Sequence, residues 1–317
     1  MNKRNILRCL AAALMMACAP AQAQDGRPIT IVVPYPPGGT ADLLPRLLGP
    51  KVEALLGGPV VILNKPGAAG NLGADFVAQS PADGKTLLVV PPHFFVADIL
   101  YKIKFVPRDF VPISIVATYP NVLLVGAKYD ALDLKGFLAT AKAAPVPLSA
   151  GSPGTGTSQH LSAEMLRLMG GFNYTHVPYK GSGPVLVDLI GGQLDFAFDN
   201  LVAALPMINS GRLKLVGVGS AKRNKRFPAV PAIQEVVPGF ESVTWMGMVA
   251  PSGTSRAIAN RLSNAFAQAA RTPEIAHQIE DMQAEVVGGS SAAMAETVHH
   301  DVARWTKVIR AANVVVD

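Results

Sequence analysis

Short apolar runs and helical patterns alternate along most of the chain, separated by turns rich in Gly and Pro. In the first part of the chain the pattern predicts strands at 29–34, 59–64 and 85–90, with helices at 40–56 and 68–80 between them. Such alternation is typical of a parallel sheet with helices packed on it. The strand runs are continuously apolar, so we expect helices to cover both faces of this sheet.

A second unit repeats the alternation further along the chain. Its predicted elements are a helix at 134–143, a strand at 146–150, a helix at 157–170, a strand at 173–178, a helix at 183–191, a strand at 194–198, a helix at 201–210 and a strand at 213–218. A strand at 242–251 and helices near 254–271, 273–283 and 291–311 complete the chain. Pro45 lies beyond the first turn of its helix and lacks an N–H, so we expect a local kink or a later helix start there.

Two apolar strands, at 122–125 and 245–249, link the two units. The first leads from the first unit into the second, and the other leads back to terminal helices that have no sheet of their own. Two connections between two α/β lobes predict a hinged clamshell that binds its ligand between the lobes. We expect domain 1 to comprise residues 24–123 and 246–317, and domain 2 to comprise residues 124–245.

The N-terminus has the pattern of a secretory signal peptide. A basic segment precedes the apolar stretch 7–19, which is too short to span a bilayer, and a cleavage site is expected after Ala23. Both cysteines, Cys9 and Cys18, lie within residues 1–23, so the exported chain would have no disulfide, thiol nucleophile or zinc–cysteine site. Cys18 also follows a sequence that loosely resembles a lipoprotein box, and lipidation there stays open.

The charge of the chain does not indicate a nucleic-acid partner. The full chain carries +6 from 28 basic and 22 acidic residues, and loss of Lys3, Arg4 and Arg8 with the signal peptide lowers this to +3. One basic cluster stands out, Lys222–Arg226, and it contains no aromatic residue. It is typical of a solvated loop rather than of a nucleic-acid surface.

The loop between the first strand and the first helix carries the main functional indication. This loop has no charged side chain, so its backbone N–H groups can approach a ligand closely. The helix that starts at Thr40 adds its positive dipole end. These features predict an anion site with Gly38, Gly39 and Thr40 as donors and with Tyr35 and Pro36 as its wall.

Asp42 allows two interpretations. Its carboxylate either faces the ligand or complements the helix dipole from the first helical turn.

A loop of the second unit is expected to face the same ligand, because the carboxyl ends of parallel strands meet at one edge of a sheet. Residues 149–160 open a helix with several hydroxyl side chains that can cap it. We expect Thr155, Gly156, Thr157 and His160 to close over the ligand from the second lobe.

The distal end of the ligand is expected near Tyr179 and Asp199, where an acid would favour a ligand with an amine or a hydroxyl. Lys180 is the only basic residue of these loops apart from Lys65. Recognition is therefore expected to use neutral donors and helix dipoles rather than an Arg clamp. This favours a mono- or dicarboxylate of amino-acid to aromatic-acid size over citrate.

The spacings that catalysis or a cofactor would require do not occur in the sequence. Gly84-Lys85-Thr86 resembles the end of a phosphate loop, but residue 79 is Gln and a strand follows. There is no Gly-x-Ser-x-Gly nucleophile elbow, and His299 and His300 are adjacent, without the spacing of metal ligands on a helix. We expect no enzymatic activity, no cofactor and no metal, with an enzyme built on a clamshell as the alternative.

Several motifs, in order along the chain, resemble the Bug-type receptors of tripartite tricarboxylate transporters. They are Val33–Asp42, Asn64–Asn71, Pro81–Leu88, Gly154–Leu161, His176–Gly181, Asp199–Asn200, Ser220–Arg223, Val249–Thr254 and Arg304–Trp305. The resemblance covers essentially the whole mature chain. The chain departs from the family pattern at Lys65, at Ala69 and at Val89–Pro92, and the last segment bears on the identity of the ligand because it lies near the expected cleft.

The resemblance implies a periplasmic solute-binding protein, a type II-like Venus flytrap that binds a carboxylate partly through main-chain groups and ordered waters. The expected ligand-binding residues are Tyr35, Pro36, Gly38, Gly39, Thr40, Asp42, His93, Thr155, Gly156, Thr157, His160, Tyr179 and Asp199. The implied role is to capture a small organic carboxylate in the periplasm and deliver it to the membrane subunits of the transporter. A ligand sensor for a membrane signalling partner is the alternative. We expect a monomer.

Overall fold

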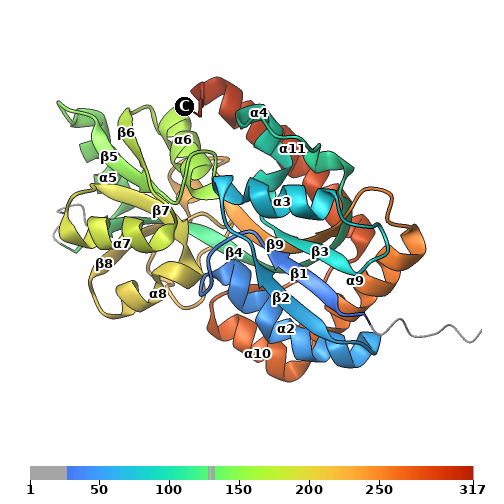
Figure 1. Cartoon of the computed structure of the whole chain (residues 1–317). Coiled ribbons are helices and arrows are strands. Elements are labelled where there is room, and N and C mark those ends of the chain that lie inside the picture. The colour runs from blue at the N-terminus through green and yellow to red at the C-terminus, as the bar shows by residue number, and fades with distance from the viewer. Residues whose placement is uncertain (1–26, 128, 130–132, 317) are drawn as a thin grey trace, which may run out of the picture.

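Two α/β lobes lie side by side, joined by strands that run from one to the other (Figure 1). The computed structural model describes residues 27–127, 129 and 133–316. The predicted signal peptide 1–23, with Cys9 and Cys18, lies outside the described residues. No helix in the described part of the chain is both long and apolar enough to cross a bilayer.

The elements follow the predicted order closely. The chain begins with β1 (Ile29–Val33), α2 (Thr40–Leu56), β2 (Val60–Asn64), η1 (Ala68–Gly70), α3 (Asn71–Ala78), β3 (Thr86–Val90), η2 (Pro92–Val96), α4 (Ala97–Leu100) and η3 (Pro107–Asp109). The long strand β4 (Val111–Gly126) leads to α5 (Leu134–Ala143), β5 (Leu148–Ser152), α6 (Ser158–Gly170), β6 (Tyr174–Pro178), α7 (Ser182–Gly191), β7 (Phe196–Asn200), α8 (Leu201–Asn209), β8 (Leu213–Val218) and η4 (Ile233–Glu235). The chain ends with β9 (Val243–Ala250), α9 (Arg256–Ala270), α10 (Pro273–Asp281), β10 (Glu285–Val286) and α11 (Ser291–Ala312).

One strand, β4, belongs to the sheets of both lobes. The strand order is β2-β1-β3-β9-β4-β7-β5-β6, with β8 and β10 also paired to β4. Residues 111–120 of β4 pair with β9 in the first lobe, and residues 121–126 pair with β7 and β8 in the second. Each lobe also contains three parallel strands, as the alternation of strands and helices predicts.

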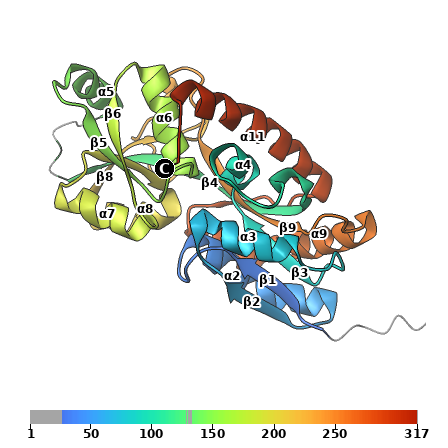
Figure 2. The same ribbon diagram turned by 45° about the horizontal axis from the view of Figure 1, so that its top comes forward.

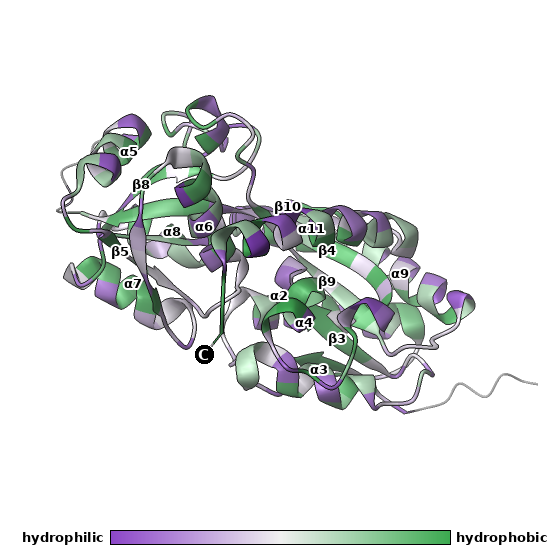
Figure 3. Ribbon diagram, turned by 90° about the horizontal axis from the view of Figure 1, so that it is seen from above, coloured by the Kyte–Doolittle hydropathy of each residue, from purple (hydrophilic) through white to green (hydrophobic). Residues whose placement is uncertain are grey.

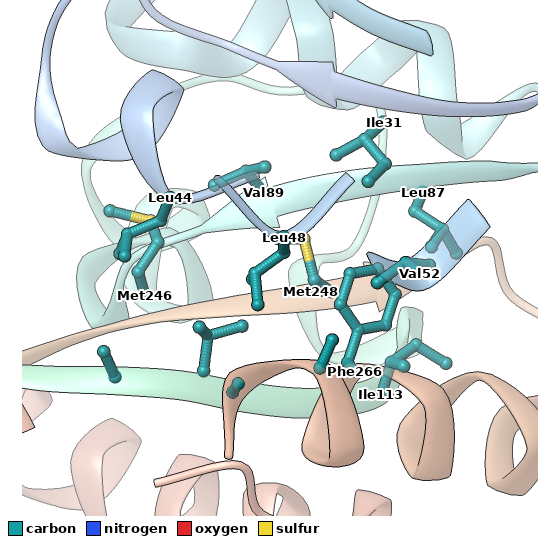
Figure 4. Close-up of a cluster of buried hydrophobic side chains, with 14 of the residues drawn as sticks. Ile31, Leu44, Leu48, Val52, Leu87, Val89, Ile113, Met246, Met248 and Phe266 are labelled. Carbon is teal, nitrogen blue, oxygen red and sulfur yellow. The ribbon is translucent and has the colours of Figure 1, made fainter. Parts of the chain in front are cut away.

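The first lobe is held together by two apolar layers, one on each face of its sheet. Successive strand residues point to opposite faces, so Ile31 joins the layer under α2 and α9, whereas Val32 joins the layer under α3 and α11. In the layer under α2, Leu48 of α2 and Phe266 of α9 lie on either side of Met248 of β9 (Figure 4). The strands are apolar and the helices turn their hydrophilic stripes outward (Figure 3). The prediction of helices on both faces therefore holds for β1 and β3.

The same prediction is wrong for β2. This strand lies at the edge of the sheet, and Val61 and Leu63 are 46% and 37% exposed. Its apolar run is as continuous as those of the buried strands, so the pattern could not distinguish it from them.

The expectation of a later helix start at Pro45 is also wrong. Helix α2 begins at Thr40 and continues through Pro45 and Pro50. The first connecting strand is longer than the predicted 122–125, because Pro112 and Pro120 interrupt the apolar run without ending β4. The pairing register of β4 with β9 shifts between Pro112 and Ser114, which accommodates the missing N–H of the proline.

Helix α11 packs on both lobes and crosses between them (Figure 2). Met294 and Val298 near its start belong to an apolar cluster of the first lobe, whereas Trp305 and Ile309 near its end belong to the main cluster of the second lobe. Between them, Asp301 accepts a hydrogen bond of 2.7 Å from the indole N–H of Trp245. The helix therefore holds the lobes together at a third place, besides β4 and β9.

Replacing Trp305 by Ala tests this role of α11. Trp305 is fully buried, so its loss should lower the free energy of unfolding by about 3–5 kcal/mol, measured by urea denaturation. Val315→Ala, at a side chain that is 66% exposed, is the control and should change stability by less than about 0.5 kcal/mol. A loss below about 1 kcal/mol in Trp305→Ala would show that α11 does not hold the second lobe.

Candidate functional site

The start of helix α2 presents unpaired backbone donors beside an open loop. Gly39 caps the helix without any side-chain cap, and the first N–H groups of a helix have no partner within it. A methyl group built on Gly38 or Gly39 would meet no atom within 4 Å. Gly38 has a φ of 93°, a conformation that side chains disfavour, whereas Gly39 has an ordinary φ of −83°. The exposed loop and the helix dipole together suit an anion, and Pro36 is exposed in the same loop.

Asp42 holds this loop in place. Its carboxylate accepts hydrogen bonds from the backbone N–H of Gly38 at 3.0 Å, from Arg46 Nε at 3.0 Å and from Asn64 Nδ2 at 2.8 Å. Burial acts to raise the pKa of Asp42, but the hydrogen bonds from Arg46, Gly38 and Asn64 bring it below its usual value. Because protein donors occupy the carboxylate, Asp42 positions the Gly38 loop rather than offering acceptors to a ligand.

The loop before α6 is braced by its own hydrogen bonds. The hydroxyl of Thr157 donates to the carbonyl of Gly154 at 2.8 Å and caps the N–H of His160 at 3.4 Å. The N–H of Gly156 donates to Nδ1 of His160 at 3.0 Å. The groups that Gly156, Thr157 and His160 were predicted to offer to a ligand are therefore bonded to each other or to Gly154 within the loop. The hydroxyl of Thr155 has no bond to a described residue.

A buried polar cluster packs against the ring of His160. Its ring stacks on that of His176 with 3.7 Å between the ring centroids, and His176 Nε2 lies 2.7 Å from Ser152 Oγ. Glu164 accepts hydrogen bonds of 2.7 Å each from Tyr174 and Arg167. Burial would raise the pKa of Glu164, but hydrogen bonds from His160, Tyr174 and Arg167 outweigh it and lower the pKa to about 2. Burial lowers the pKa of the His176 ring to about 3.

His93 connects the two lobes. Its Nδ1 accepts a hydrogen bond of 3.3 Å from the N–H of Ser158, the first residue of α6, and its Nε2 lies 3.3 Å from the hydroxyl of Tyr35. Burial lowers the pKa of His93 to about 4. The ring is therefore neutral at neutral pH, and the bond from Ser158 assigns its proton to Nε2, which donates to Tyr35.

A small pocket lies between the lobes. Its lining includes Tyr35, His93 and Tyr101 from the first lobe and Thr155 and Thr157 from the second. The hydroxyl of Tyr101 donates to the carbonyl of Thr155 at 2.7 Å, a second direct bond between the lobes. The pocket measures about 20 Å³, room for about one water molecule, so a larger ligand requires the lobes to move apart.

Asp199 has a free acceptor that is fully buried. Its Oδ1 accepts from Ser182 Oγ at 2.8 Å and from the N–H of Asn200 at 2.7 Å. No described group lies at hydrogen-bond distance and angle to Asp199 Oδ2 or to the buried Oδ1 of Asn200. Burial raises the pKa of Asp199 to about 6, although Ser182, the N–H of Asn200 and the nearby side chain of Gln159 act to lower it. An unpartnered buried acceptor is costly, so this position suits a donor supplied from outside the chain.

Tyr179 is directed toward its own lobe. Its hydroxyl donates to Asp188 of α7 at 2.6 Å, and this bond and burial raise the pKa of Tyr179 to about 12. It therefore does not offer a free hydroxyl to the distal end of a ligand.

Four residues that contribute to the site are not among the expected ligand-binding residues, although two of them, Ser158 and Asn200, lie in motifs of the family resemblance. They are Tyr101, Ser158, Ser182 and Asn200. Ser158, Ser182 and Asn200 lie at or beside the starts of helices α6, α7 and α8, so the rule that helix starts gather at one edge of a sheet could have found them. Tyr101 carries no such indication. Among the described residues no group of three His, Cys, Asp or Glu side chains is placed to hold a metal.

The buried neutral state of His93 predicts a pH effect on stability. The pKa of His93 is about 4 in the folded protein and about 6.5 in an unfolded chain, so the unfolded chain binds more protons between these values. Stability should therefore fall as the pH falls from about 6.5 to about 4. In His93→Gln the loss between pH 7 and pH 4.5, measured by urea denaturation, should be smaller than in the wild type by about 2–3 kcal/mol.

The exposed His277 provides the control for this measurement. His277→Gln should lose as much stability as the wild type over the same pH range. Other titratable groups also make stability depend on pH, and Asp199, whose pKa is raised by folding, does so in the opposite direction to His93. These contributions are the same in all three proteins. Equal losses in wild type and His93→Gln would contradict the burial of a neutral His93.

Comparison with known proteins identifies the family. The model of the tripartite tricarboxylate transporter family receptor matches residues 45–314. The chain is 33% identical to Protein BugT of Bordetella pertussis over 306 residues, which cover 95% of this chain and 94% of BugT.

Solved structures with a similar fold include two that hold small acids. R. palustris Rpa4515 with adipate has a TM-score of 0.85 and 34% identity, covering 92% of this chain and 99% of that one. MatC (Rpa3494) from Rhodopseudomonas palustris with bound malate has a TM-score of 0.81 and 30% identity, covering 89% of this chain and 99% of that one. The chain therefore belongs to the family of tripartite tricarboxylate transporter receptors, which are periplasmic solute-binding proteins.

Proposed function

We propose that this protein captures a small organic carboxylate between its lobes and delivers it to the membrane subunits of a tripartite tricarboxylate-type transporter. The observation that carries the proposal is the uncapped start of α2 beside the open loop at Gly38 and Gly39. Adipate and malate in the similar Rpa4515 and MatC structures support a carboxylate. The protein acts in the periplasm as a monomer after cleavage near Ala23, and it does not transform its ligand.

Capture requires the lobes to open and close about a hinge. The pairing of β4 changes partners between Pro120 and Asn121, and β9 begins at Val243, beside this change. These positions lie a few residues before the boundaries of the proposed domains, which are residues 24–123 and 246–317 for domain 1 and residues 124–245 for domain 2. Closure would bring the backbone of Ser158 and Thr155 toward His93 and Tyr101, the side chains that bond them in this structure.

The ligand is expected to be held mainly by neutral donors. The first carboxylate is bound by the backbone of Gly39 and Thr40 and by the dipole of α2. The nearby Arg46 is not its partner, because its guanidinium already pairs with Asp42. The hydroxyl of Thr155 contributes from the second lobe. Neutral donors cannot balance three negative charges well, so a mono- or dicarboxylate is favoured over citrate.

A ligand screen tests this function. The mature protein is heated with adipate, malate, aspartate, benzoate, citrate or glucose, and a true ligand should raise the melting temperature with increasing concentration. Calorimetry then measures the dissociation constants. Shifts with glucose and none with any carboxylate would overturn the proposal.

Gly39→Val identifies the binding site. The added Cβ has space in the folded protein and Gly39 has an allowed φ, so the loop should keep its shape while the valine covers the helix start. Replacing Gly at the N-cap should cost about 1 kcal/mol of stability or less. Binding of the ligand found in the screen should weaken by about 1–3 kcal/mol or more. Gly191→Val, also in open space but at the far end of α7, is the control. Normal binding by Gly39→Val would place the carboxylate site elsewhere.

Asp199→Asn tests the second end of the site. Its Oδ1 can still accept from Ser182 and Asn200, but the free acceptor becomes an N–H donor. If a ligand hydroxyl bonds Asp199 Oδ2, the wild type should prefer malate to succinate, and this preference should fall by about 1–3 kcal/mol in the variant. The exposed Asp281→Asn is the control. An unchanged preference would show that Asp199 does not contact the ligand.

A further inference from the structure

Two side chains of the first lobe contact the loop before α6 in the second lobe. Leu100, the last residue of α4, lies so close to Gly156 that a methyl group built there would overlap its Cδ1 atom. Tyr101 follows it, and its hydroxyl donates to the carbonyl of Thr155 at 2.7 Å. Gly156 has a φ of 77°, so the loop turns sharply where it meets Leu100.

These two side chains also line the pocket between the lobes. They stand there with Tyr35 and Gly70, at a place where the remaining space is only about 20 Å³. Leu100 is apolar, and the one polar atom of the Tyr101 side chain is already bonded to Thr155. These two side chains therefore take up space in the pocket and offer no hydrogen-bond donor to a carboxylate.

The pocket that Leu100 and Tyr101 line is also lined by predicted ligand-binding residues of both lobes. Tyr35 and His93 line it from the first lobe, and Thr155, Gly156 and Thr157 line it from the second. Leu100 and Tyr101 therefore border the space in which a ligand between the lobes would lie.

We propose that Leu100 and Tyr101 set the maximum length of the carboxylate that the closed protein can hold. This inference rests on the proposed function, because it concerns the same ligand. A ligand longer than the space up to these two side chains would keep α4 away from Gly156 and prevent the bond between Tyr101 and Thr155. The site would therefore select short acids by exclusion, without any charged side chain at this end.

The test measures affinity against ligand length. Calorimetry with unbranched dicarboxylates from malonate to sebacate gives the profile of the wild type, of Leu100→Ala, of Tyr101→Ala and of the double variant. The longest tight ligand should grow by at least two methylene groups in the double variant, with about tenfold or more tighter binding of acids that the wild type rejects. The melting temperature measured without ligand shows whether each variant is folded. If the double variant is unfolded, a folded single variant is compared with the wild type instead.

Two matched variants separate length from other effects. Tyr101→Phe keeps the ring but loses the bond to Thr155, so it should weaken all acids to a similar degree and leave the length profile unchanged. Ile99→Ala changes the neighbouring side chain, which is 38% exposed, and should behave as the wild type. If the wild type binds and the profiles of the Ala variants coincide with it, only this inference is overturned. If no acid of the series binds the wild type, this inference is overturned, whereas the proposed function is overturned only if no carboxylate of the ligand screen binds either.

Discussion

The structure depends on a single strand that must satisfy its hydrogen bonds in two sheets. Strand β4 pairs with β9 over its first ten residues and with β7 and β8 over the rest, so neither sheet is complete without it. At the change of partners, the buried Asn121 donates through Nδ2 to Ser162 Oγ at 3.1 Å and to Ser242 Oγ at 2.9 Å. These two bonds fix the orientation of the Asn121 side chain, although its buried Oδ1 has no partner among the described residues. The junction is therefore well defined, while the lobes on either side are free to differ in their ligand loops.

The site between the lobes is built almost entirely from groups without a formal charge. The start of α2 offers backbone donors, His93 is neutral, and the acids Asp42 and Glu164 are paired within their own lobes. Such groups attract an anion through dipoles that cost nothing to reorganise when the ligand leaves. This suits the proposed delivery of the ligand to a transporter, since a desolvated ion pair with Arg would be slow to break.

The contacts between the lobes are few and direct. His93 accepts from the backbone of Ser158, Tyr101 donates to the backbone of Thr155, and Leu100 touches Gly156. In both hydrogen bonds the second lobe contributes main-chain atoms, so their geometry depends on the shape of the loop before α6. That shape is held by Thr157 and by the stacked pair His160 and His176. Thr157 and His160, which the sequence predicts as ligand contacts, thus also support this loop.

The sequence alone was sufficient for the two-lobe α/β architecture, the family and nearly all helices and strands. The architecture and the elements depend on local periodicity and on turn residues, and α5 and β8 were predicted at the bounds they have in the structure. The family was indicated by the resemblance of ordered motifs. Only the tertiary structure decided which apolar strand lies at an edge, because Val61 is exposed through its position next to β1 and not through its neighbours in the chain. The same holds for the site. The polar character of Asp199, His160 and Tyr179 is visible in the sequence, but whether a partner such as Ser182, Gly156 or Asp188 already occupies each group depends on residues that only folding brings within hydrogen-bond distance.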